Sequence, residues 1–482
     1  MATERFGLKI PGVKSAAPDT TVLAPFDRTP IGTVATADAA SVERALTIAH
    51  ALYRNRDAWL PLAKRIEILE NTASLMKARA ATLAVEAARE GGKPLIDSKV
   101  EVARAIDSVR IAVEHLRTQQ GEVIPMSVGA SSANRYAFTQ VEPIGVVVAV
   151  SAFNHPLNLI THQVGPAVAA GCPVLVKPAK TTPLSCFRFV EMLREAGLPE
   201  DWCIPLLPEN NDLTTKMVTD PRVAFFSFIG SARVGWMLRS RLAPGTRCAL
   251  EHGGVAPAIV AADADLKVAV PAIVKGGFYH AGQVCVSVQR VYAERGKAEE
   301  LAKAIAAAAD KLKVGDPTAA DTEVGPMIDP AEVKRVGEWV DEAVAKGAKV
   351  LCGHKKLSDT CYAPTVLLDP PDDVRISTEE VFGPVVCVYS ADSIDQAIAR
   401  ANSLPVSFQA AVFTQSIDTA LRCYQRLDAS AVMVNDHTAF RVDWMPFAGL
   451  RVSGHGVGGV PYTLHDMQVR KMMVMNSPEI KR

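Results

Sequence analysis

The feature that most constrains the fold is a series of short, continuous apolar runs that alternate with helical segments. Between residues 143 and 252 these runs lie at 144–150, 173–176, 203–207, 224–229 and 248–250. A strand that is apolar along its whole length needs cover on both faces, as in a parallel sheet with helices on each side. The pattern therefore predicts a doubly wound α/β domain of the dinucleotide-binding type.

A second alternating series follows Gly253-Gly254, so we expect two α/β lobes with a hinge at these glycines. Because 482 residues exceed what one hydrophobic core usually supports, two or three domains are expected. Residues 41–118 carry apolar positions at helical spacing in three blocks and are expected to be mostly helix. In the second lobe we predict strands near 288–294, 364–368, 384–389, 409–413 and 431–435, and helices near 298–312, 331–347, 393–403 and 416–427.

Composition and charge exclude several classes of function. With 52 basic and 52 acidic residues the chain has no net field for nucleic acid, and 49% apolar content is that of an ordinary globular enzyme. The nine cysteines include no CxxC pair and no Cys/His cluster, so we expect neither a disulfide framework nor a metal site. Residues 1–7 do not resemble a leader, and no run reaches the roughly 18 apolar residues of a membrane span. We expect a cytoplasmic protein with no membrane partner.

Cys285 and Glu251 form the strongest candidate for chemistry. Cys285 lies 34 positions after Glu251, which opens the Gly-rich element Glu251-His252-Gly253-Gly254. A thiol at its reference pKa of about 8.5 is mostly protonated at neutral pH and must be activated to act as a nucleophile. A carboxylate in a Gly-rich turn can remove that proton or activate a water molecule. The alternative for any single cysteine is a buried core residue, since free cysteine is among the most buried residue types.

The dinucleotide signature is unusual, because no GxGxxG follows the first strand. Instead the apolar run 224–229 leads into Gly230-Ser231 and then into a helix. Glycine lets a phosphate approach the backbone, and the start of a helix offers free N–H groups. A Gly-Ser helix start by itself is also an ordinary N-cap.

Eight motifs, in order along most of the chain, resemble those of the aldehyde dehydrogenase superfamily. The resemblance implies two doubly wound α/β lobes, a Rossmann-like NAD(P)-binding domain at 1–120 and 143–252 and a catalytic domain at 253–453. It also implies a small β oligomerisation element at 121–142 and 454–482, where strand-like segments occur at 132–141 and 469–475. The motifs are Pro143-Ile144-Gly145, Phe153-Asn154, Lys177-Pro178-Ala179, Phe228-Ile229-Gly230-Ser231, Glu251-His252-Gly253-Gly254, Gly282-Gln283-Val284-Cys285, Glu379-Glu380-Val381-Phe382-Gly383-Pro384 and Pro446-Phe447-Ala448-Gly449.

The resemblance also implies roles for individual residues. The Cys285 thiolate would attack the aldehyde, the Asn154 amide and the Cys285 backbone N–H would hold the oxyanion, and Glu251 would activate the water that releases the acid. The cofactor would be NAD or NADP. Its contacts would come from Lys177 and Glu380 on the ribose hydroxyls, Phe382 near the nicotinamide ribose, and Gly230 and Ser231 at the phosphates.

Several positions depart from the family pattern without removing a catalytic group. The family's usual Pro-Trp-Asn is Ala152-Phe153-Asn154, its Phe-Gly-Gly is Phe447-Ala448-Gly449, and His252 follows Glu251. Lys180 stands where NAD-using relatives commonly have a glutamate for the adenine ribose. A lysine would not repel a 2′-phosphate, so NADP is a possible cofactor.

The substrate pocket implied by the resemblance is unusually polar. His155, Asn158 and His162 are expected on one exposed helix face, and Arg104, Arg441 and Phe447 align with other pocket positions. Guanidinium groups bind carboxylate, phosphate or phosphonate in a bidentate manner. We therefore expect a small, anionic, phosphonoacetaldehyde-like substrate, in line with the resemblance of residues 435–446 to the lactaldehyde and phosphonoacetaldehyde dehydrogenase branch.

Alternatives stay open at this point. Arg104 taken alone could be a surface arginine paired with Glu101 or Asp107. The substrate could be lactaldehyde, glyceraldehyde 3-phosphate or a semialdehyde. A coenzyme A-acylating enzyme, a thiol hydrolase and a non-catalytic protein are less favoured, because Glu251 and Cys285 are both present. The resemblance implies a homodimer or homotetramer.

Overall fold

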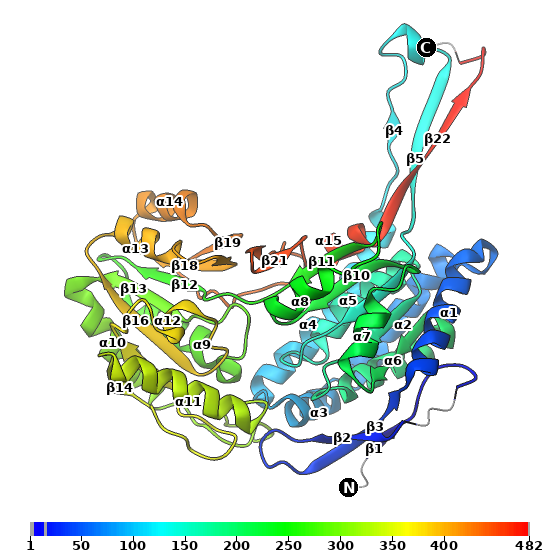
Figure 1. Cartoon of the computed structure of the whole chain (residues 1–482). Coiled ribbons are helices and arrows are strands. Elements are labelled where there is room, and N and C mark those ends of the chain that lie inside the picture. Colours follow the sequence, from blue (N-terminus) through cyan, green and yellow to red (C-terminus); the bar gives the residue numbers. More distant parts are fainter. Residues whose placement is uncertain (1–3, 14–16, 481–482) are drawn as a thin grey trace.

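The computed structural model describes residues 4–13 and 17–480 of the chain. The domain bounds expected at residues 1 and 482 lie outside the described residues. Two large sheets with their helices form the two halves of the molecule, and a long β arm projects from one of them (Figure 1). The α/β fold with parallel sheets predicted from the apolar runs is confirmed.

The first sheet has six strands in the order β21-β11-β10-β6-β7-β8. Its five parallel strands coincide with the predicted runs, and the two-residue β21 pairs antiparallel with β11 at the edge. The strands are β6 (Val146–Val150), β7 (Val174–Lys177), β8 (Cys203–Pro205), β10 (Val223–Ile229), β11 (Arg247–Glu251) and β21 (Gly454–His455).

Alternate residues of these strands enter two different cores, which explains why the runs are apolar throughout. Val147 and Ala149 of β6 pack with α2 (Leu62–Ala78), α4 (Leu95–Thr118) and α5 (Asn158–Ala170). On the other face, residues 146, 148 and 150 pack with helices that include α1 (Ala39–Arg54) and α8 (Ala232–Arg239). Each helix layer covers one face of the parallel sheet.

The helical region before the first sheet contains four helices rather than three blocks. The three-block prediction is wrong because α2 and α3 (Ala80–Gly91) follow each other almost without a gap. Arg79 between them leaves the helical backbone region, with φ −102° and ψ 9°. A hydrophobic pattern that continues across such a break does not mark it.

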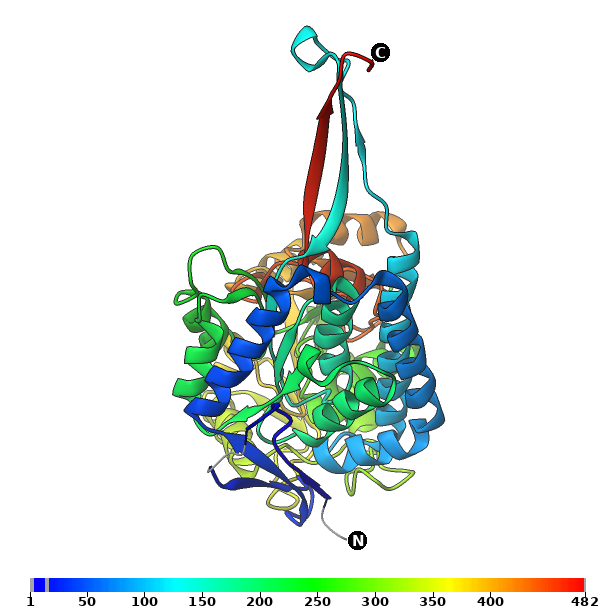
Figure 2. The same cartoon turned by 90° about the vertical axis from the view of Figure 1, so that its right-hand side faces the viewer.

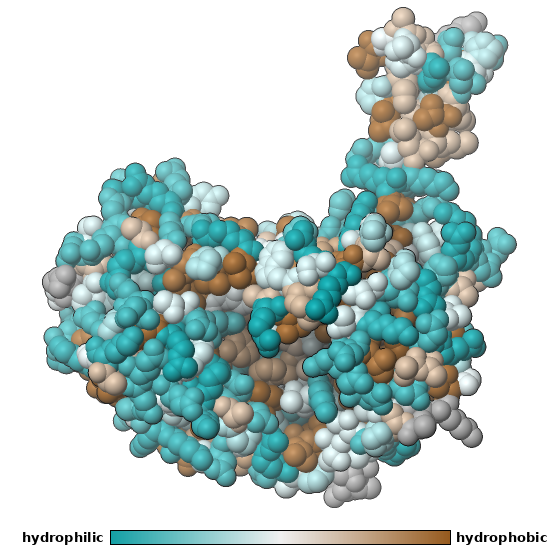
Figure 3. Space-filling view, in the orientation of Figure 1, coloured by the Kyte–Doolittle hydropathy of each residue, from teal (hydrophilic) through white to brown (hydrophobic). Residues whose placement is uncertain are grey.

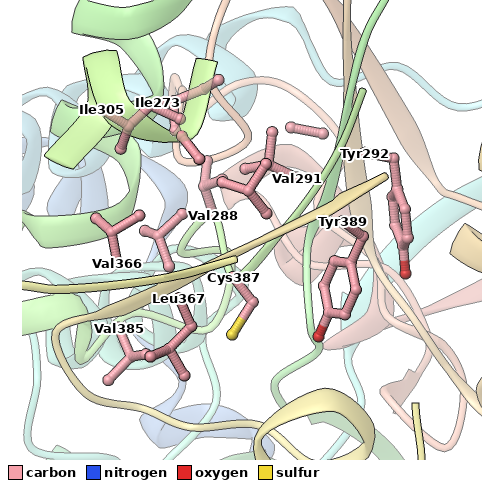
Figure 4. Packing of buried hydrophobic residues seen from close by; sticks show 14 of the residues in the cluster. Ile273, Val288, Val291, Tyr292, Ile305, Val366, Leu367, Val385, Cys387 and Tyr389 are labelled. Carbon is pink, nitrogen blue, oxygen red and sulfur yellow. The ribbon is translucent and has the colours of Figure 1, made fainter. Parts of the chain in front are cut away.

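The second sheet has seven strands in the order β14-β15-β16-β13-β12-β18-β19, and only β14 runs antiparallel. Valines and isoleucines from the sheet and its helices fill the core beside it, and Tyr292 and Tyr389 stack with ring centroids 5.2 Å apart (Figure 4). The strands are β12 (Pro257–Val260), β13 (Arg290–Glu294), β14 (Lys349–Cys352), β15 (Thr365–Leu368), β16 (Val385–Ala391), β18 (Gln409–Phe413) and β19 (Ala431–Val434).

The four helices predicted in this lobe are present. They are α10 (Arg295–Ala309), α11 (Pro330–Ala345), α13 (Ile394–Ala401) and α14 (Ile417–Arg426). α9 (Leu266–Phe278), before the cysteine motif, and the short α12 (Arg375–Thr378) were not predicted.

The arm consists of three antiparallel strands, β22-β5-β4, that extend away from both halves (Figures 1 and 2). β5 (Arg135–Pro143) and β22 (Gln468–Asn476) pair in register along their whole length, and β4 (Val123–Ile124) adds two residues. Strands were predicted at both long segments. Exposed apolar side chains lie along β22 at residues 472–475, and brown patches mark the arm in Figure 3.

An N-terminal sheet had no counterpart in the predictions. β1 (Glu4–Phe6), β2 (Asp19–Leu23) and β3 (Pro30–Ala37) form it, and β9 (Leu207–Pro208) pairs with β3. In the described part of the chain no helix is long and apolar enough to span a membrane.

The order of the strands places the candidate motifs at the carboxyl ends of the strands of the first sheet. From β6 the chain builds β7 and β8 on one side and β10 and β11 on the other, so the direction of winding reverses between β6 and β10. The carboxyl ends of parallel strands open into a crevice at such a point. In register, Val150 of β6 lies beside Lys177 of β7, and Ile229 of β10 lies beside Glu251 of β11.

Candidate active site

A cavity of about 840 Å³ lies where the two halves meet, and the face in Figure 3 is hollowed there. It brings together every residue predicted for catalysis, cofactor binding and substrate binding except His162. The residues that line it are Cys285, Glu251, Asn154, Lys177, Lys180, Gly230, Ser231, Glu380, Phe382, Arg104, His155, Asn158, Arg441 and Phe447.

The loop that carries Cys285 is held by a left-handed turn and by one glutamine. His280, Ala281 and Gly282 have φ of 53°, 54° and 68°. A Cβ at Gly282 would lie 2.1 Å from the carbonyl oxygen of Gly383, so only glycine fits this close approach. Gln283 then fixes the loop to residues 326–328: its Nε2 donates to the Pro326 oxygen at 3.1 Å and its Oε1 accepts from the Ile328 N–H at 2.9 Å.

The buried environment of Cys285 favours the protonated thiol over the thiolate. Burial raises the pKa of the Cys285 thiol to about 12, and the nearby Glu380 and Glu251 carboxyls add to the rise. Arg441 acts in the opposite direction. Because only the thiolate is a strong nucleophile, a neighbouring base must take the thiol proton during attack.

Asn154 lies beside the nucleophile on the loop after β6. Its Nδ2 donates to the Gln283 backbone oxygen at 2.9 Å, which ties the two loops together and leaves its second N–H for another acceptor. The buried Glu101 fixes the end of this loop, because its Oε1 accepts from the Leu157 and Asn158 N–H groups at 3.0 and 3.1 Å. Its other oxygen lies 2.5 Å from the Nζ of Lys93.

Glu251, the last residue of β11, points into the cavity against Gly458. A Cβ on Gly458 would lie 2.2 Å from Oε1 of Glu251, so the carboxylate rests directly on this glycine. Gly458 and Phe447 exchange two backbone hydrogen bonds of 2.7 and 3.0 Å. Burial raises the pKa of the Glu251 carboxyl and Arg441 opposes that rise, so Glu251 can act as a proton acceptor near neutral pH.

The residues expected to hold NAD or NADP fit a dinucleotide. Glu380 packs against Gly253, burial raises the pKa of its carboxyl to about 8, and its buried Oε1 has no hydrogen-bond partner among the described residues. A ribose hydroxyl would satisfy such an oxygen. Lys177 lies at the carboxyl end of β7 without a salt bridge to any described residue. α8 begins at Ala232 with Ser231 as its N-cap, and the first N–H groups of the helix face the cavity.

Two exposed cations and two aromatic rings complete this end of the cavity. Lys180 and Arg233 line its rim, and within the described ranges neither forms a salt bridge. Phe382 has φ 45° and contacts Phe153 edge to face, with ring centroids 5.7 Å apart. For metals, the described residues contain no group of three or more His, Cys, Asp or Glu that could hold an ion.

Arg104 has a different partner from the ones considered in the sequence. Its Nε and Nη2 donate to both oxygens of Asp443 at 3.0 and 2.6 Å, so pairing with Glu101 or Asp107 is wrong. Asp443 also accepts from His162 Nε2 at 2.7 Å and lies 3.5 Å from Asn158 Nδ2. Its side chain is only 2% exposed, so Asp443 is the buried centre of this polar cluster.

The expected helix face with His155, Asn158 and His162 is also wrong. α5 begins at Asn158, so His155 precedes it, and every residue of α5 is buried. His162 therefore lies behind the cavity wall. His155 does line the cavity, and its Nε2 lies 2.8 Å from the hydroxyl oxygen of Tyr279.

Arg441 is the cation at this end that lacks a carboxylate partner. Its guanidinium lies 3.5 Å from the centre of the Phe447 ring, and its Nη2 lies 3.4 Å from His162 Nδ1. Its buried Nε has no hydrogen-bond partner and it forms no salt bridge within the described part of the molecule. Cation–π contact and burial hold the group in place.

Sequence reasoning missed three residues of this site: Asp443, Tyr279 and Gly458. Asp443 had a recognisable signal, since it lies two positions after Arg441 in the segment 435–446 that resembles the lactaldehyde and phosphonoacetaldehyde dehydrogenase branch. Gly458 and Tyr279 had none, because their importance depends on contacts with residues far away in the chain.

Comparison with known proteins places the whole chain in one family. The chain is 35% identical over 474 residues to a 3-sulfolactaldehyde dehydrogenase of Priestia aryabhattai, covering 98% of each. It superposes on aldehyde dehydrogenase 21 from Physcomitrella patens in complex with the reaction product succinate, with a TM-score of 0.94, 33% identity and coverage of 99% and 100%. Glyceraldehyde-3-phosphate dehydrogenase GapN from Methanocaldococcus jannaschii complexed with NADP gives a TM-score of 0.90, 32% identity and coverage of 96% and 100%.

The Aldehyde dehydrogenase family model matches residues 13–473, which is nearly the entire sequence. The chain therefore belongs to the aldehyde dehydrogenase family, and it is an oxidoreductase that acts on an aldehyde group with NAD or NADP as its cofactor.

Proposed function

We propose that this enzyme oxidises a small aldehyde with an anionic tail to the corresponding carboxylic acid. The observation that carries the proposal is Arg441, a cation without a salt bridge among the described residues, in the same cavity as Cys285 and Glu251. Val284 and Val286, the apolar residues on either side of Cys285, line the cavity beside the nucleophile. They favour small aldehydes such as phosphonoacetaldehyde, lactaldehyde with an added acidic group, and semialdehydes. The similarity to a sulfolactaldehyde dehydrogenase and to a complex with succinate supports an anion.

The first half-reaction rests on three residues. Cys285 Sγ attacks the carbonyl carbon while Glu251 accepts the thiol proton, and the carbonyl oxygen becomes an oxyanion. The Asn154 side chain and the Cys285 backbone N–H donate to that oxyanion, and such preorganised donors are worth about 10²–10³ in rate each. Lys177, Glu380 and the start of α8 would hold NAD or NADP, which would supply the acceptor for the hydride that leaves the carbon as its C=O bond reforms. Loss of this hydride leaves a thioester on Cys285.

The second half-reaction returns the enzyme to its starting form. Glu251 first releases to solvent the proton that it accepted from Cys285. It then takes a proton from a water molecule, and the oxygen of that water attacks the thioester on Cys285. The C–S bond then breaks, the acid is released, and the Cys285 sulfur takes the proton back from Glu251, which restores the thiol. The position of Glu251 on Gly458 supports this role, because its carboxylate is fixed at the cavity wall near Cys285.

The test compares Arg441→Met with wild type on two aldehydes of equal length, one anionic and one neutral. Loss of hydrogen bonds to a charged group costs about 1.5–3 kcal/mol, so kcat/KM for the anionic aldehyde should fall roughly 10-fold to 150-fold. The neutral aldehyde should change far less. Arg110→Met, at an exposed position on α4, is the matched control. An equal loss on both aldehydes, or a wild type that prefers the neutral one, contradicts the proposal.

The arm supports a further part of the proposal, that the enzyme is a homodimer or homotetramer. β22 is an edge strand with unpaired backbone groups on one side and exposed apolar residues at 472–475. An exposed edge of this kind favours pairing with another chain. Sedimentation of wild type against a variant with Met473 and Met475 changed to lysine checks this, since a monomeric wild type would contradict it.

A further inference from the structure

The end of the cavity around Arg104 and Arg441, called here the anion end, carries a small number of charged groups. Arg104 and Arg441 are cations, and the carboxylate of Asp443 binds Arg104 through both of its oxygens. Although burial alone would raise the pKa of Asp443, the hydrogen bond from His162 and the charge and hydrogen bonds of Arg104 hold that pKa far below its usual range, so Asp443 is ionised. Two cations and one carboxylate leave a single positive charge.

None of the neighbouring titratable groups adds positive charge to this cluster. Burial lowers the pKa of His155 and of His162 and raises the pKa of Tyr279, so all three are neutral near pH 7. Two pairs of charged groups beside the cluster neutralise each other: Lys93 with Glu101, and Lys275 with Asp97. Asp107 lies close enough to Asp443 for the two carboxyls to repel each other, so it adds no positive charge. Glu251 and Glu380 lie near Cys285, and Glu251 also interacts with Arg441, so these carboxyls can only reduce the positive potential further and make a second negative charge on the tail less favourable.

The two arginines therefore differ in what they can offer a substrate. The charge of Arg104 is neutralised by Asp443, but its Nη1 group forms no hydrogen bond to a described residue and can still donate. Arg441 can donate, and within the described residues its charge has no salt-bridge partner, although Glu251 lies near enough to interact with it. A tail with one negative charge would be balanced at this site. A tail with two would leave one charge unpaired in a half-buried cavity, close to the carboxylate of Asp443.

We propose that the site selects aldehydes whose tail carries a single negative charge, a sulfonate or a carboxylate, over the dianions of phosphonate or phosphate. Asp443 is then a specificity-determining residue that acts through Arg104. It lies behind the cavity wall, and its carboxylate lowers the positive charge of the anion end of the cavity by one. This inference rests on the proposed function, and it reverses the preference expected from the sequence for a phosphonate.

The first experiment needs only the wild-type enzyme. Short aldehydes of equal length with a sulfonate, a phosphonate or a neutral methyl sulfone are compared by kcat/KM at saturating cofactor. At about pH 8, where the phosphonate is a dianion, the sulfonate should be preferred by roughly tenfold or more. At about pH 6 the phosphonate gains a proton and the preference should narrow. The sulfonate does not titrate, so it reports any effect of pH on the enzyme itself.

The second experiment changes the charge of the site. Asp443→Asn raises the net charge by one, so the ratio of sulfonate to phosphonate should fall about tenfold or more at pH 8. The double variant with Asp443→Asn and Arg104→Met restores a single positive charge and should return the ratio toward wild type. Ratios of substrates on one enzyme cancel a general loss of activity. If Asp443→Asn does not fold, the wild-type pH comparison still decides.

The outcomes separate the two proposals. A wild type that prefers the phosphonate dianion, or an Asp443→Asn variant with an unchanged ratio, overturns the inference about charge and leaves the anionic substrate intact. A wild type that uses the neutral methyl sulfone as well as both anions overturns the proposed function itself.

Discussion

Arg104 and Asp443, which are 339 positions apart in the sequence, form a two-point ion pair with distances of 2.6 and 3.0 Å. The pair joins α4 of the first half to the segment after β19 of the second half. Removing one partner of such a buried pair leaves an uncompensated charge, which is more damaging than the pair is stabilising. The substrate end of the cavity therefore depends on both halves being in place.

The reactivity of Cys285 should depend on Glu380. Because burial and this carboxylate both raise the pKa of the thiol, alkylation of the cofactor-free enzyme by iodoacetamide should accelerate about tenfold per pH unit from about pH 7 to about pH 9. At about pH 9, where the Glu380 carboxyl with its pKa of about 8 is ionised, Glu380→Gln removes a negative charge and should speed alkylation several-fold. Glu379→Gln, at the exposed neighbouring position, is the control. No difference between the two variants would place Glu380 too far from the sulfur to act on it.

Glu251→Gln should separate the two half-reactions. Without a proton acceptor the thioester on Cys285 accumulates, so rapid mixing should show a burst of reduced cofactor followed by a slow steady state. Since burial raises the pKa of Glu251, the wild-type steady-state rate should increase with pH as this group loses its proton. The variant should lack that dependence. Equal losses of burst and steady state would instead make Glu251 mainly the activator of Cys285.

Gly458→Ala should reduce turnover although Gly458 has no reactive group. A Cβ there would lie 2.2 Å from Oε1 of Glu251 and 2.9 Å from the Phe447 oxygen, so the carboxylate must move. A displacement of about 1 Å at a reacting group can cost about 10²-fold in rate. Gly296→Ala on α10 is the control, because its Cβ would meet open space. Wild-type kcat in Gly458→Ala would mean that Glu251 works from another position.

Lys180→Glu should shift cofactor preference toward NAD. Lys180 and Arg233 lie at the cavity rim without salt bridges among the described residues, and a carboxylate there would repel a 2′-phosphate. The measurement is the ratio of kcat/KM for NADP and NAD. Lys311→Glu, at an exposed position of the second lobe, should leave that ratio unchanged. If Lys180→Glu behaves like this control, another residue sets the preference.

The sequence predicted the sheets well because strands buried on both faces are continuously apolar. It predicted Cys285, Glu251 and Asn154 as candidates because each lies within a short local motif. The N-terminal sheet was missed for the opposite reason. β2 and β3 mix Asp, Thr, Gly and Pro with apolar residues, so they show neither a continuous run nor a clear alternation.

The anion end was predicted only in part, because its geometry depends on distant contacts. Arg104 was identified, but its partner lies 339 positions away, and the nearby Glu101 instead holds the start of α5. His162 was placed on an exposed face because a helix with polar residues at regular spacing usually has one. α5 is enclosed on all sides, so spacing alone could not locate its cavity side.

The segment between Arg441 and β22 has a consequence for how the enzyme is made. It supplies Arg441 and Asp443, and it places Gly458 against Glu251. It also adds β21 beside β11 and contributes Val460 and Leu464 of α15 (Val460–Asp466) to the core between the first sheet and helices α2, α4 and α5. A ribosome-bound chain that has reached only residue 440 therefore has an open sheet edge and an unfinished pocket. Activity in a translation reaction should appear only after this segment has emerged, and until then the growing chain is a natural client of chaperones that bind exposed strands.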